Sequence, residues 1–290
     1  MENSRIILGT AQFGQNYGIA NTCGRPSDEQ VAAILTTAYD AGIRLLDTAA
    51  AYGESEQVLG RVLKRLGLSG RMLLASKIPP LPPGMPPEEA RRRIGGVLEN
   101  SLRNLGIPTL YAVLFHREEN LEYLHVLRQW QQRGALRLVG VSVDCALPPT
   151  LGDCEVVQIP ANVLDRRFLK LMTERTAGLR VFARSVYLQG LLLMPEERVP
   201  GHLRAVVPLC RALGRLAQDS GMGFAELCLR YLLSFPGVEG VLTGVDTVEQ
   251  LKMNLRLAEK GALPTEVLKA VREAVPELPE MIIRPSLWNR

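Results

Sequence analysis

The sequence has few of the residues that build metal centres or disulfide frameworks. Among its 290 residues there are only three histidines and five cysteines, and no two cysteines form a C-x-x-C pair. Structural zinc sites and small disulfide-rich domains require such closely spaced ligands or paired cysteines. We therefore expect no bound metal, and scattered free thiols favour a reduced, cytoplasmic setting.

Long apolar runs and strongly basic segments are also missing. No stretch approaches the length of a membrane-spanning helix. The formal net charge is only +4, and the densest basic run, Arg91–Arg93, follows Glu88 and Glu89 after a single residue. That pattern is typical of a solvated helix face, and aromatic residues, at 5%, are too sparse for stacking on bases. We expect neither a nucleic-acid nor a membrane partner.

Short apolar runs, by contrast, recur regularly along the chain. Hydrophobic residues make up 47% and charged residues 22% of the sequence, the balance of a globular protein with a sizeable core. Continuous short apolar runs are typical of parallel strands buried on both faces. The predicted strands are Arg5–Thr10, Ile43–Asp47, Met72–Lys77, Leu110–His116, Leu136–Ser142, Val156–Ile159, Arg180–Arg184 and Gly240–Gly244.

The segments between these runs have helical periodicity, as in Arg204–Gln218, Ala225–Leu233 and Asp246–Leu257. Eight strands alternating with helices predict an α/β fold, a single (β/α)8 barrel domain over residues 1–290. The alternative is a doubly wound open sheet, which would hold a dinucleotide at a G-x-G-x-x-G turn after its first strand. The segment Gly9–Gly14 does not match that turn.

Ionisable residues stand at the ends of consecutive predicted strands. Asp47, Lys77 and His116 end the second, third and fourth runs, and Tyr52 follows Asp47 in a loop of small residues. Taken singly, each has an ordinary structural interpretation, such as a helix cap or a buried core histidine. Because the carboxyl ends of barrel strands meet at one face, we expect all four side chains to share one pocket.

Such a group of residues supports carbonyl reduction. A tyrosine hydroxyl, with a pKa near 10, is a weak acid at neutral pH, and a neighbouring Lys77 ammonium would lower that pKa. Asp47 would hold the ammonium in place, and His116 would donate a hydrogen bond to the substrate oxygen. Tyr52 would then protonate the oxygen while a nicotinamide delivers hydride to carbon.

Several segments of the chain resemble those of a known family. The segments Gly42–Ala49 and Tyr52–Gly60 resemble the signature of the aldo/keto reductase superfamily. Further blocks appear in the family's order, and the resemblance extends roughly from Ile6 to Asn254. These blocks are Ala75–Lys77, Leu114–His116, Arg137–Ser142, Gln158–Asp165, Ala183–Leu192 and Gly244–Asn254.

The resemblance implies a barrel that binds NADPH in extended form across its C-terminal mouth, with Asp47, Tyr52, Lys77 and His116 as the catalytic tetrad. It assigns Ser142 and Gln158 to the nicotinamide carboxamide. It places Ser185, Leu188 and Gly190 at the pyrophosphate, and Gly244, Asp246, Gln250 and Asn254 along the adenosine.

Three positions depart from the family's pattern. Val143 stands where an asparagine usually follows the serine that matches Ser142, and Arg184 stands where an aromatic often stacks on the nicotinamide. The arginine would stack on the ring or meet a phosphate. Asp246 would repel the 2′-phosphate of NADPH and suit a free ribose hydroxyl, unless Lys252 compensates. NADPH is the expected cofactor, and NADH is the alternative.

The substrate is less well defined by the sequence. Few aromatic residues favour polar carbonyl compounds such as sugars or short aldehydes. The C-terminal tail could either bring Trp288 over the barrel mouth or pack it against the outside. The alternative function is a nicotinamide-binding redox sensor or scaffold. A second rival, an aldolase that forms a Schiff base at Lys77, is disfavoured by the paired Tyr52 and the absence of a second lysine.

Overall fold

The computed structural model describes residues 4–288, and in it eight parallel strands close into a barrel in the order of the sequence. β1 pairs with both β2 and β8, which closes the sheet and excludes the doubly wound alternative. The predicted (β/α)8 barrel is thereby confirmed. The strands are β1 (Ile6–Gly9), β2 (Leu45–Asp47), β3 (Leu73–Ile78), β4 (Leu110–Phe115), β5 (Leu136–Ser142), β6 (Val156–Pro160), β7 (Arg180–Arg184) and β8 (Val238–Gly244).

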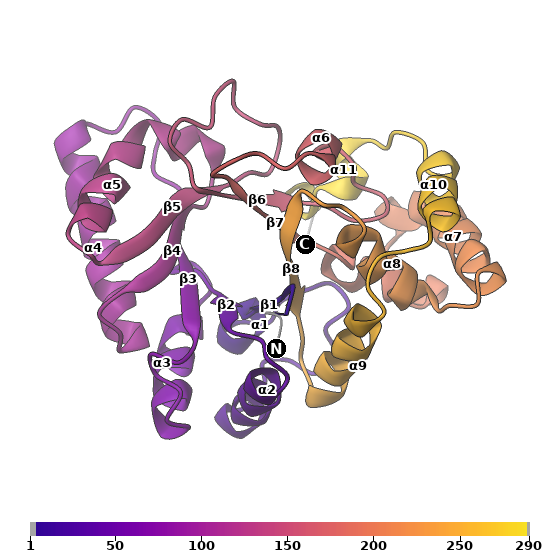
Figure 1. Cartoon of the computed structure of the whole chain (residues 1–290), viewed down its shortest axis with the longest axis horizontal. Coiled ribbons are helices and arrows are strands. Elements are labelled where there is room, and N and C mark those ends of the chain that lie inside the picture. Colours follow the sequence, from indigo (N-terminus) through magenta and orange to yellow (C-terminus); the bar gives the residue numbers. More distant parts are fainter. Residues whose placement is uncertain (1–3, 289–290) are drawn as a thin grey trace.

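Helices surround these strands (Figure 1). The α-helices are α1 (Ala11–Gly14), α2 (Asp28–Asp40), α3 (Ser55–Arg65), α4 (Pro87–Leu105), α5 (Leu124–Gln132), α6 (Leu169–Thr173), α7 (Val207–Asp219), α8 (Phe224–Leu233), α9 (Val248–Glu259), α10 (Thr265–Ala274) and α11 (Glu280–Ile283). The 3-10 helices are η1 (Glu118–Tyr123), η2 (Leu188–Leu193), η3 (Glu196–Arg198), η4 (Gly201–Val206) and η5 (Pro285–Leu287).

Two separate hydrophobic clusters follow from the alternation of side chains along each strand. Outward-facing residues pack against the helices in the larger cluster. Inward-facing residues fill the barrel in a second cluster, to which every strand contributes. Its buried members are Ile7, Ala75, Ala112, Leu114, Val156, Phe182 and Leu242, and the partly buried Leu45, Tyr111 and Leu138 pack against them. Because successive strand residues point to opposite sides, continuous apolar runs serve both clusters at once.

Some predicted boundaries differ from the observed ones, for identifiable reasons. β2 begins at Leu45 and not at the predicted Ile43. The amide of Ile43 donates to the carbonyl of Ala38 at 2.9 Å, in the turn that follows α2, and so does not bind to a neighbouring strand. The helix predicted over Arg204–Gln218 is divided into η4 and α7. A proline, Pro208, lies in the first turn of α7, where its missing N–H is tolerated.

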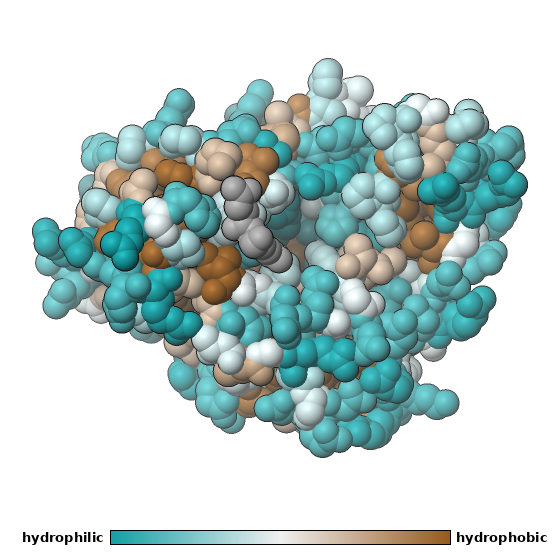
Figure 2. Space-filling model, turned by 180° about the vertical axis from the view of Figure 1, so that it is seen from behind, coloured by the Kyte–Doolittle hydropathy of each residue, from teal (hydrophilic) through white to brown (hydrophobic). Residues whose placement is uncertain are grey.

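The outer surface of the molecule is predominantly polar on the face opposite to that of Figure 1. Figure 2 shows hydrophilic residues over most of that face, with hydrophobic residues in small separate groups. Within residues 4–288, no helix combines the length and the apolar character needed to cross a membrane.

The close approach of β5 and β6 at Gly140 leads us to predict that a side chain at this position lowers the stability of the fold. A Cβ at position 140 would lie 1.8 Å from the carbonyl oxygen of Val156, a backbone atom that cannot move without disturbing the sheet. We expect Gly140→Ala to lower the free energy of unfolding by about 3 kcal/mol, measured by urea denaturation. Gly96→Ala is the control, because a Cβ there meets nothing within 4 Å, and it should leave stability unchanged or slightly raised. Equal stability of the two variants would contradict this packing argument.

Candidate active site

The predicted site residues occupy the inward-facing layer directly above the apolar filling of the barrel. Asp47, Lys77 and His116 each follow an inward-facing apolar residue by two positions in the sequence. Since strand side chains repeat with a period of two, these three point toward the barrel axis as well. The same spacing applies to the remaining members of this layer, Gln158, Arg184 and Gly244, while Ser142 lies four positions after Leu138.

A buried ion pair forms the base of the site. Lys77 Nζ lies 2.5 Å from Asp47 Oδ2, and their side chains are 0% and 5% exposed. Lys77 also donates to the carbonyl of Thr48 at 3.0 Å, while Gln158 Nε2 donates to Asp47 Oδ1 at 2.8 Å. Burial lowers the pKa of Lys77, and Asp47 opposes that effect. Both carboxylate oxygens are therefore occupied, and the ammonium is held in one position.

Tyr52 and His116 lie beside this pair. Lys77 Nζ is 5.1 Å from the centre of the Tyr52 ring, and the rings of Tyr52 and His116 meet edge to face with centroids 5.7 Å apart. The loop that carries Tyr52 packs closely on Gly14, where a Cβ would lie 1.9 Å from the Tyr52 carbonyl oxygen. The structure thus brings the four predicted residues together.

The protonation of Tyr52 differs from the sequence-based expectation. Burial and the neighbouring charge of Asp47 raise the pKa of Tyr52 above its ordinary value, and Arg184 acts in the opposite direction. Desolvation disfavours the phenolate, and this outweighs the attraction of nearby cations. The phenol therefore keeps its proton throughout the neutral range.

His116 is held neutral in the same environment. Burial, together with the positive charges of Lys77 and Arg184, lowers the pKa of His116 to about 3. Its Nδ1 is buried and has no hydrogen-bond partner among the described residues. A neutral imidazole carries one N–H donor and one acceptor, so His116 can donate a hydrogen bond without acting as an acid.

A pocket of about 370 Å³ opens beside Tyr52 and extends along the ends of β7 and β8. Ser142 and Leu188 are buried and do not line it, in contrast to the other residues that the resemblance assigned to the cofactor. The predicted residues that line the pocket are Gln158, Arg184, Ser185, Gly190, Gly244, Asp246, Gln250 and Asn254.

Sequence reasoning missed a further wall of this pocket. Gln12, Tyr17, Ala20 and Asn21, which follow β1, line it as well. A Cβ at Gly190 would lie 2.4 Å from the Cβ of Ala20, so the segment after β1 meets the segment after β7 across the pocket. These residues belong to no strand and match no motif, so their spacing carried no signal.

The backbone after β7 has an unusual conformation. The φ angles of Ser185, Leu188 and Gln189 are 71°, 48° and 55°, in the left-handed region that residues with a Cβ seldom adopt. Backbone strain of this kind concentrates at ligand-binding sites. The strained segment forms one side of the pocket, where the resemblance placed the pyrophosphate.

The polar groups of the pocket fit a nicotinamide dinucleotide. Gln158 Oε1 is buried without a partner among the described residues, and is suited to accept from a carboxamide N–H. At the other end, Asp246 Oδ1 accepts from Asn21 Nδ2 at 3.3 Å. Lys252 does not line this pocket; it faces Thr37 and other residues at the end of α2. It is therefore not placed in the pocket beside Asp246.

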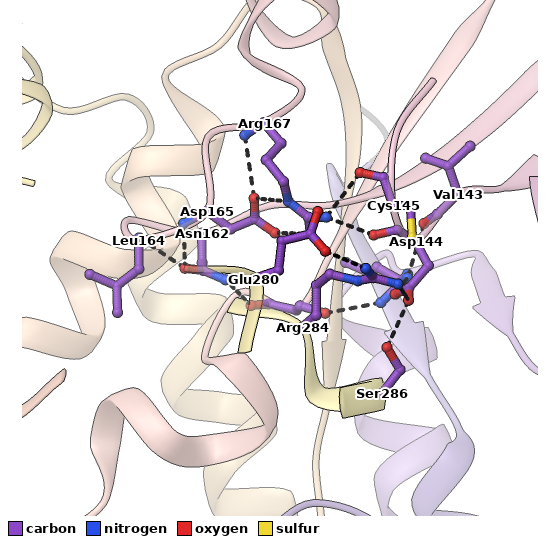
Figure 3. A network of polar contacts seen from close by, with 12 residues as sticks. Val143, Asp144, Cys145, Asn162, Leu164, Asp165, Arg167, Glu280, Arg284 and Ser286 are labelled. Carbon is purple, nitrogen blue, oxygen red and sulfur yellow. Dashed lines mark hydrogen bonds and ion pairs between the residues drawn. The ribbon is translucent and has the colours of Figure 1, made fainter. Parts of the chain in front are cut away.

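The C-terminal tail reaches the barrel mouth through polar residues. Ser286 Oγ donates to Asp144 Oδ2 at 2.8 Å, and Arg284 Nη2 lies 3.1 Å from the same oxygen (Figure 3). Trp288 is only 6% exposed and its Nε1 donates to the carbonyl of Met281, within the larger hydrophobic cluster. Of the two placements considered for Trp288, the structure shows packing outside the pocket.

The sequence also matches a known protein family. The sequence profile of the aldo/keto reductase family matches residues 5–276. The chain belongs to the aldo/keto reductase family. Proteins of this family are oxidoreductases that generally use nicotinamide cofactors and act on small carbonyl substrates.

Several relatives are distant but match over most of their length. This aldo/keto reductase is 23% identical to the aldo-keto reductase str7 of Strobilurus tenacellus, over 93% of this chain and 87% of that protein. It is 26% identical to the L-glyceraldehyde 3-phosphate reductase of Escherichia coli O157:H7, over 90% and 86%. The holo form of aldo-keto reductase AKR11C1 from Bacillus halodurans shares the fold, with a TM-score of 0.76 and 21% identity over 96% and 94% of the two chains.

The depressed pKa of His116 predicts a pH-dependent stability. The folded reductase binds this proton only near pH 3, whereas the unfolded chain binds it near the ordinary value of 6.5, so acidification below 6.5 favours unfolding. Between pH 7 and pH 5 the unmodified protein should lose about 2 kcal/mol more unfolding free energy than His116→Gln. Urea denaturation at both pH values measures this, with the exposed His202→Gln as control. Equal losses in all three proteins would show that His116 is not held neutral by the fold.

Proposed function

We propose that this chain is an NAD(P)H-dependent carbonyl reductase, which converts an aldehyde or ketone into an alcohol with Tyr52 as the proton donor. One observation carries the proposal: Tyr52, His116 and the Lys77–Asp47 ion pair meet at one end of a pocket whose polar groups fit a nicotinamide dinucleotide.

The side chains suggest how the reaction proceeds. When bound, the reduced nicotinamide supplies a hydride to the carbonyl carbon. Neutral His116 donates a hydrogen bond that orients and polarises the carbonyl oxygen. Tyr52 gives its phenolic proton to that oxygen as negative charge develops on it. The Lys77 ammonium, 5.1 Å from the centre of the ring, then stabilises the phenolate, and Asp47 keeps the ammonium in place.

The cofactor would extend from the tetrad toward β8 and α9. Gln158, with Ser142 beside it, would bind the carboxamide, and Arg184 would lie against the nicotinamide. The strained segment from Ser185 through Leu188 to Gly190 would approach the pyrophosphate. The residues proposed for the adenosine end are Gly244, Asp246, Gln250 and Asn254. NADPH is the cofactor that the resemblance implies, and the half-buried Asp246 favours binding of NADH as well.

The polar lining of the pocket supports a polar substrate, of sugar-like or short-chain type. One relative's name, L-glyceraldehyde 3-phosphate reductase, is consistent with this class. An intact tetrad also argues against a pure redox sensor, which would need to bind the dinucleotide but would not need a proton donor.

Replacement of the proton donor tests the reductase directly. Tyr52→Phe should lower the kcat for reduction of 4-nitrobenzaldehyde by at least about 100-fold, because the phenolic proton is lost. Its affinity for NADPH, measured by fluorescence titration, should stay within about twofold of the unmodified protein. Tyr39→Phe is the matched control, because Tyr39 lies on α2 and its ring contacts Arg44. Cofactor binding without any turnover by the unmodified protein would instead favour the sensor.

Charge removal at the adenosine end tests the cofactor assignment. Asp246→Asn keeps an oxygen that can accept from Asn21 but removes the repulsion of a 2′-phosphate. We expect the Kd for NADPH to fall about fivefold relative to the Kd for NADH, measured by fluorescence titration of both. The exposed Asp219→Asn on α7 should leave the ratio unchanged. An Asp246→Asn variant with an unchanged ratio would mean that Asp246 does not face the 2′ position.

A further inference from the structure

Several arginines surround one carboxylate at the edge of the candidate active site. Arg117 Nη1 lies 2.9 Å from Asp144 Oδ2, and Arg284 Nη2 lies 3.1 Å from the same oxygen. Arg184 Nη2 lies 3.2 Å from Asp144 Oδ1 and also donates to the carbonyl of Val143. We call Arg117, Arg184 and Arg284, together with Asp144, the arginine cluster.

Both oxygens of the Asp144 carboxylate, at the centre of this cluster, have hydrogen-bond or ion-pair partners. Burial alone would raise the pKa of Asp144, but the hydrogen bond from Ser286 and the charges of Arg184 and Arg284 hold it well below its ordinary value. The C-terminal tail supplies Arg284 and Ser286 and so fixes Asp144 in place (Figure 3). Several partners therefore hold Asp144 in the position from which it contacts the arginines.

Two other carboxylates near the cluster, those of Glu280 and Glu118, have partners of their own. Glu280 pairs with Arg284 from the solvent side, where its side chain is 54% exposed. Glu118 accepts hydrogen bonds from the backbone amides of Asp144 and Cys145, at 3.1 and 2.9 Å. Neither carboxylate makes an ion pair with Arg117 or Arg184 among the described residues.

Arg117 keeps most of its donors available. Asp144 takes a hydrogen bond from Nη1, and within residues 4–288 neither Nε nor Nη2 of Arg117 donates to another residue. The side chain is 36% exposed. A guanidinium has five N–H donors in a planar fork that matches carboxylate and phosphate oxygens.

The cluster also lies close to the reacting groups. Arg184 lines the same pocket as Tyr52. Arg117, which directly follows His116 in the sequence, does not line that pocket, but it shares the Asp144 carboxylate with Arg184. The pKa of His116 is lowered mainly by burial, and the positive charges of Lys77, Arg184 and Arg117 lower it further. An anionic group close to a bound carbonyl would therefore meet a guanidinium already held in position.

From these contacts we propose that Arg117, supported by Arg184, forms an anion-binding subsite, and that the preferred substrates are carbonyl compounds bearing a carboxylate or a phosphate. This inference rests on the proposed reductase function and names its substrate class. The anion is recognised by charge-assisted hydrogen bonds to the guanidinium edges. Asp144 acts as a positioning residue, because it orients the arginines without contacting the substrate.

Pairs of substrates that differ in charge test the subsite. The full-length chain is assayed with NADPH on 4-carboxybenzaldehyde against neutral 4-carbamoylbenzaldehyde, and on glyceraldehyde 3-phosphate against glyceraldehyde. We expect kcat/KM to be about tenfold or more higher for at least one anionic member, mainly through KM. The pair that shows the preference identifies carboxylate or phosphate as the favoured group. Added salt should reduce the preference.

Variants of Arg117 assign the preference to this residue. Arg117→Gln should reduce the anionic-to-neutral ratio of kcat/KM to about 1–3, while Arg117→Lys should retain much of it. Asp144 keeps Arg184, Arg284 and Ser286 in both variants, so the fold should be preserved. The control is Arg103→Gln, since Arg103 is exposed in the last turn of α4 and contacts Asn100.

Each outcome has a distinct meaning. Equal kcat/KM within both pairs would overturn the anion-binding subsite and leave the reductase function intact. A strong preference that persists in Arg117→Gln would overturn the role of Arg117. If none of the four aldehydes is reduced although NADPH binds, the proposed reductase function itself fails, and the subsite with it.

Discussion

The buried ion pair between Lys77 and Asp47 is the interaction on which the rest of the site depends. Burial of two charges costs several kcal/mol unless they are closely paired and their remaining hydrogen-bonding groups are satisfied. Here Lys77 also donates to the Thr48 carbonyl, and Gln158 donates to the second carboxylate oxygen. The pair thereby links β2, β3 and β6 across the inside of the barrel. Loss of either partner would leave an uncompensated charge beneath Tyr52.

Neutral and positively charged groups surround this pair. Tyr52 retains its proton, His116 is neutral, and Lys77 and Arg184 supply positive charge from two sides. In the reaction that we propose, such an arrangement would stabilise an oxyanion as it forms, because the charges are already in place and excluded from water. The tail strengthens the arrangement through Asp144, which holds Arg184 against the carbonyl of Val143.

Much of the fold and of the candidate site could be predicted from local sequence patterns. The apolar runs located the strands, and the ionisable residues at the ends of consecutive runs indicated Asp47, Lys77 and His116. Resemblance to the family then added Gln158 and most of the pocket residues along β7 and β8. Residues without periodicity were not predictable in this way. Tyr17 and Asn21 face the pocket only because the segment after β1 folds back over it.

The sequence by itself therefore determined the barrel, its strand order and the ring of polar residues at one mouth, because these depend on side chains that alternate within each strand. Only the tertiary structure decided which charges neutralise one another. Asp144 meets Arg284 and Ser286 from the far end of the chain, and Lys252 lines a depression beside the end of α2 and not the pocket that holds Asp246. Contacts between distant segments, and the desolvation that accompanies them, decide the pKa values of Tyr52 and His116, and no spacing along the sequence encodes them.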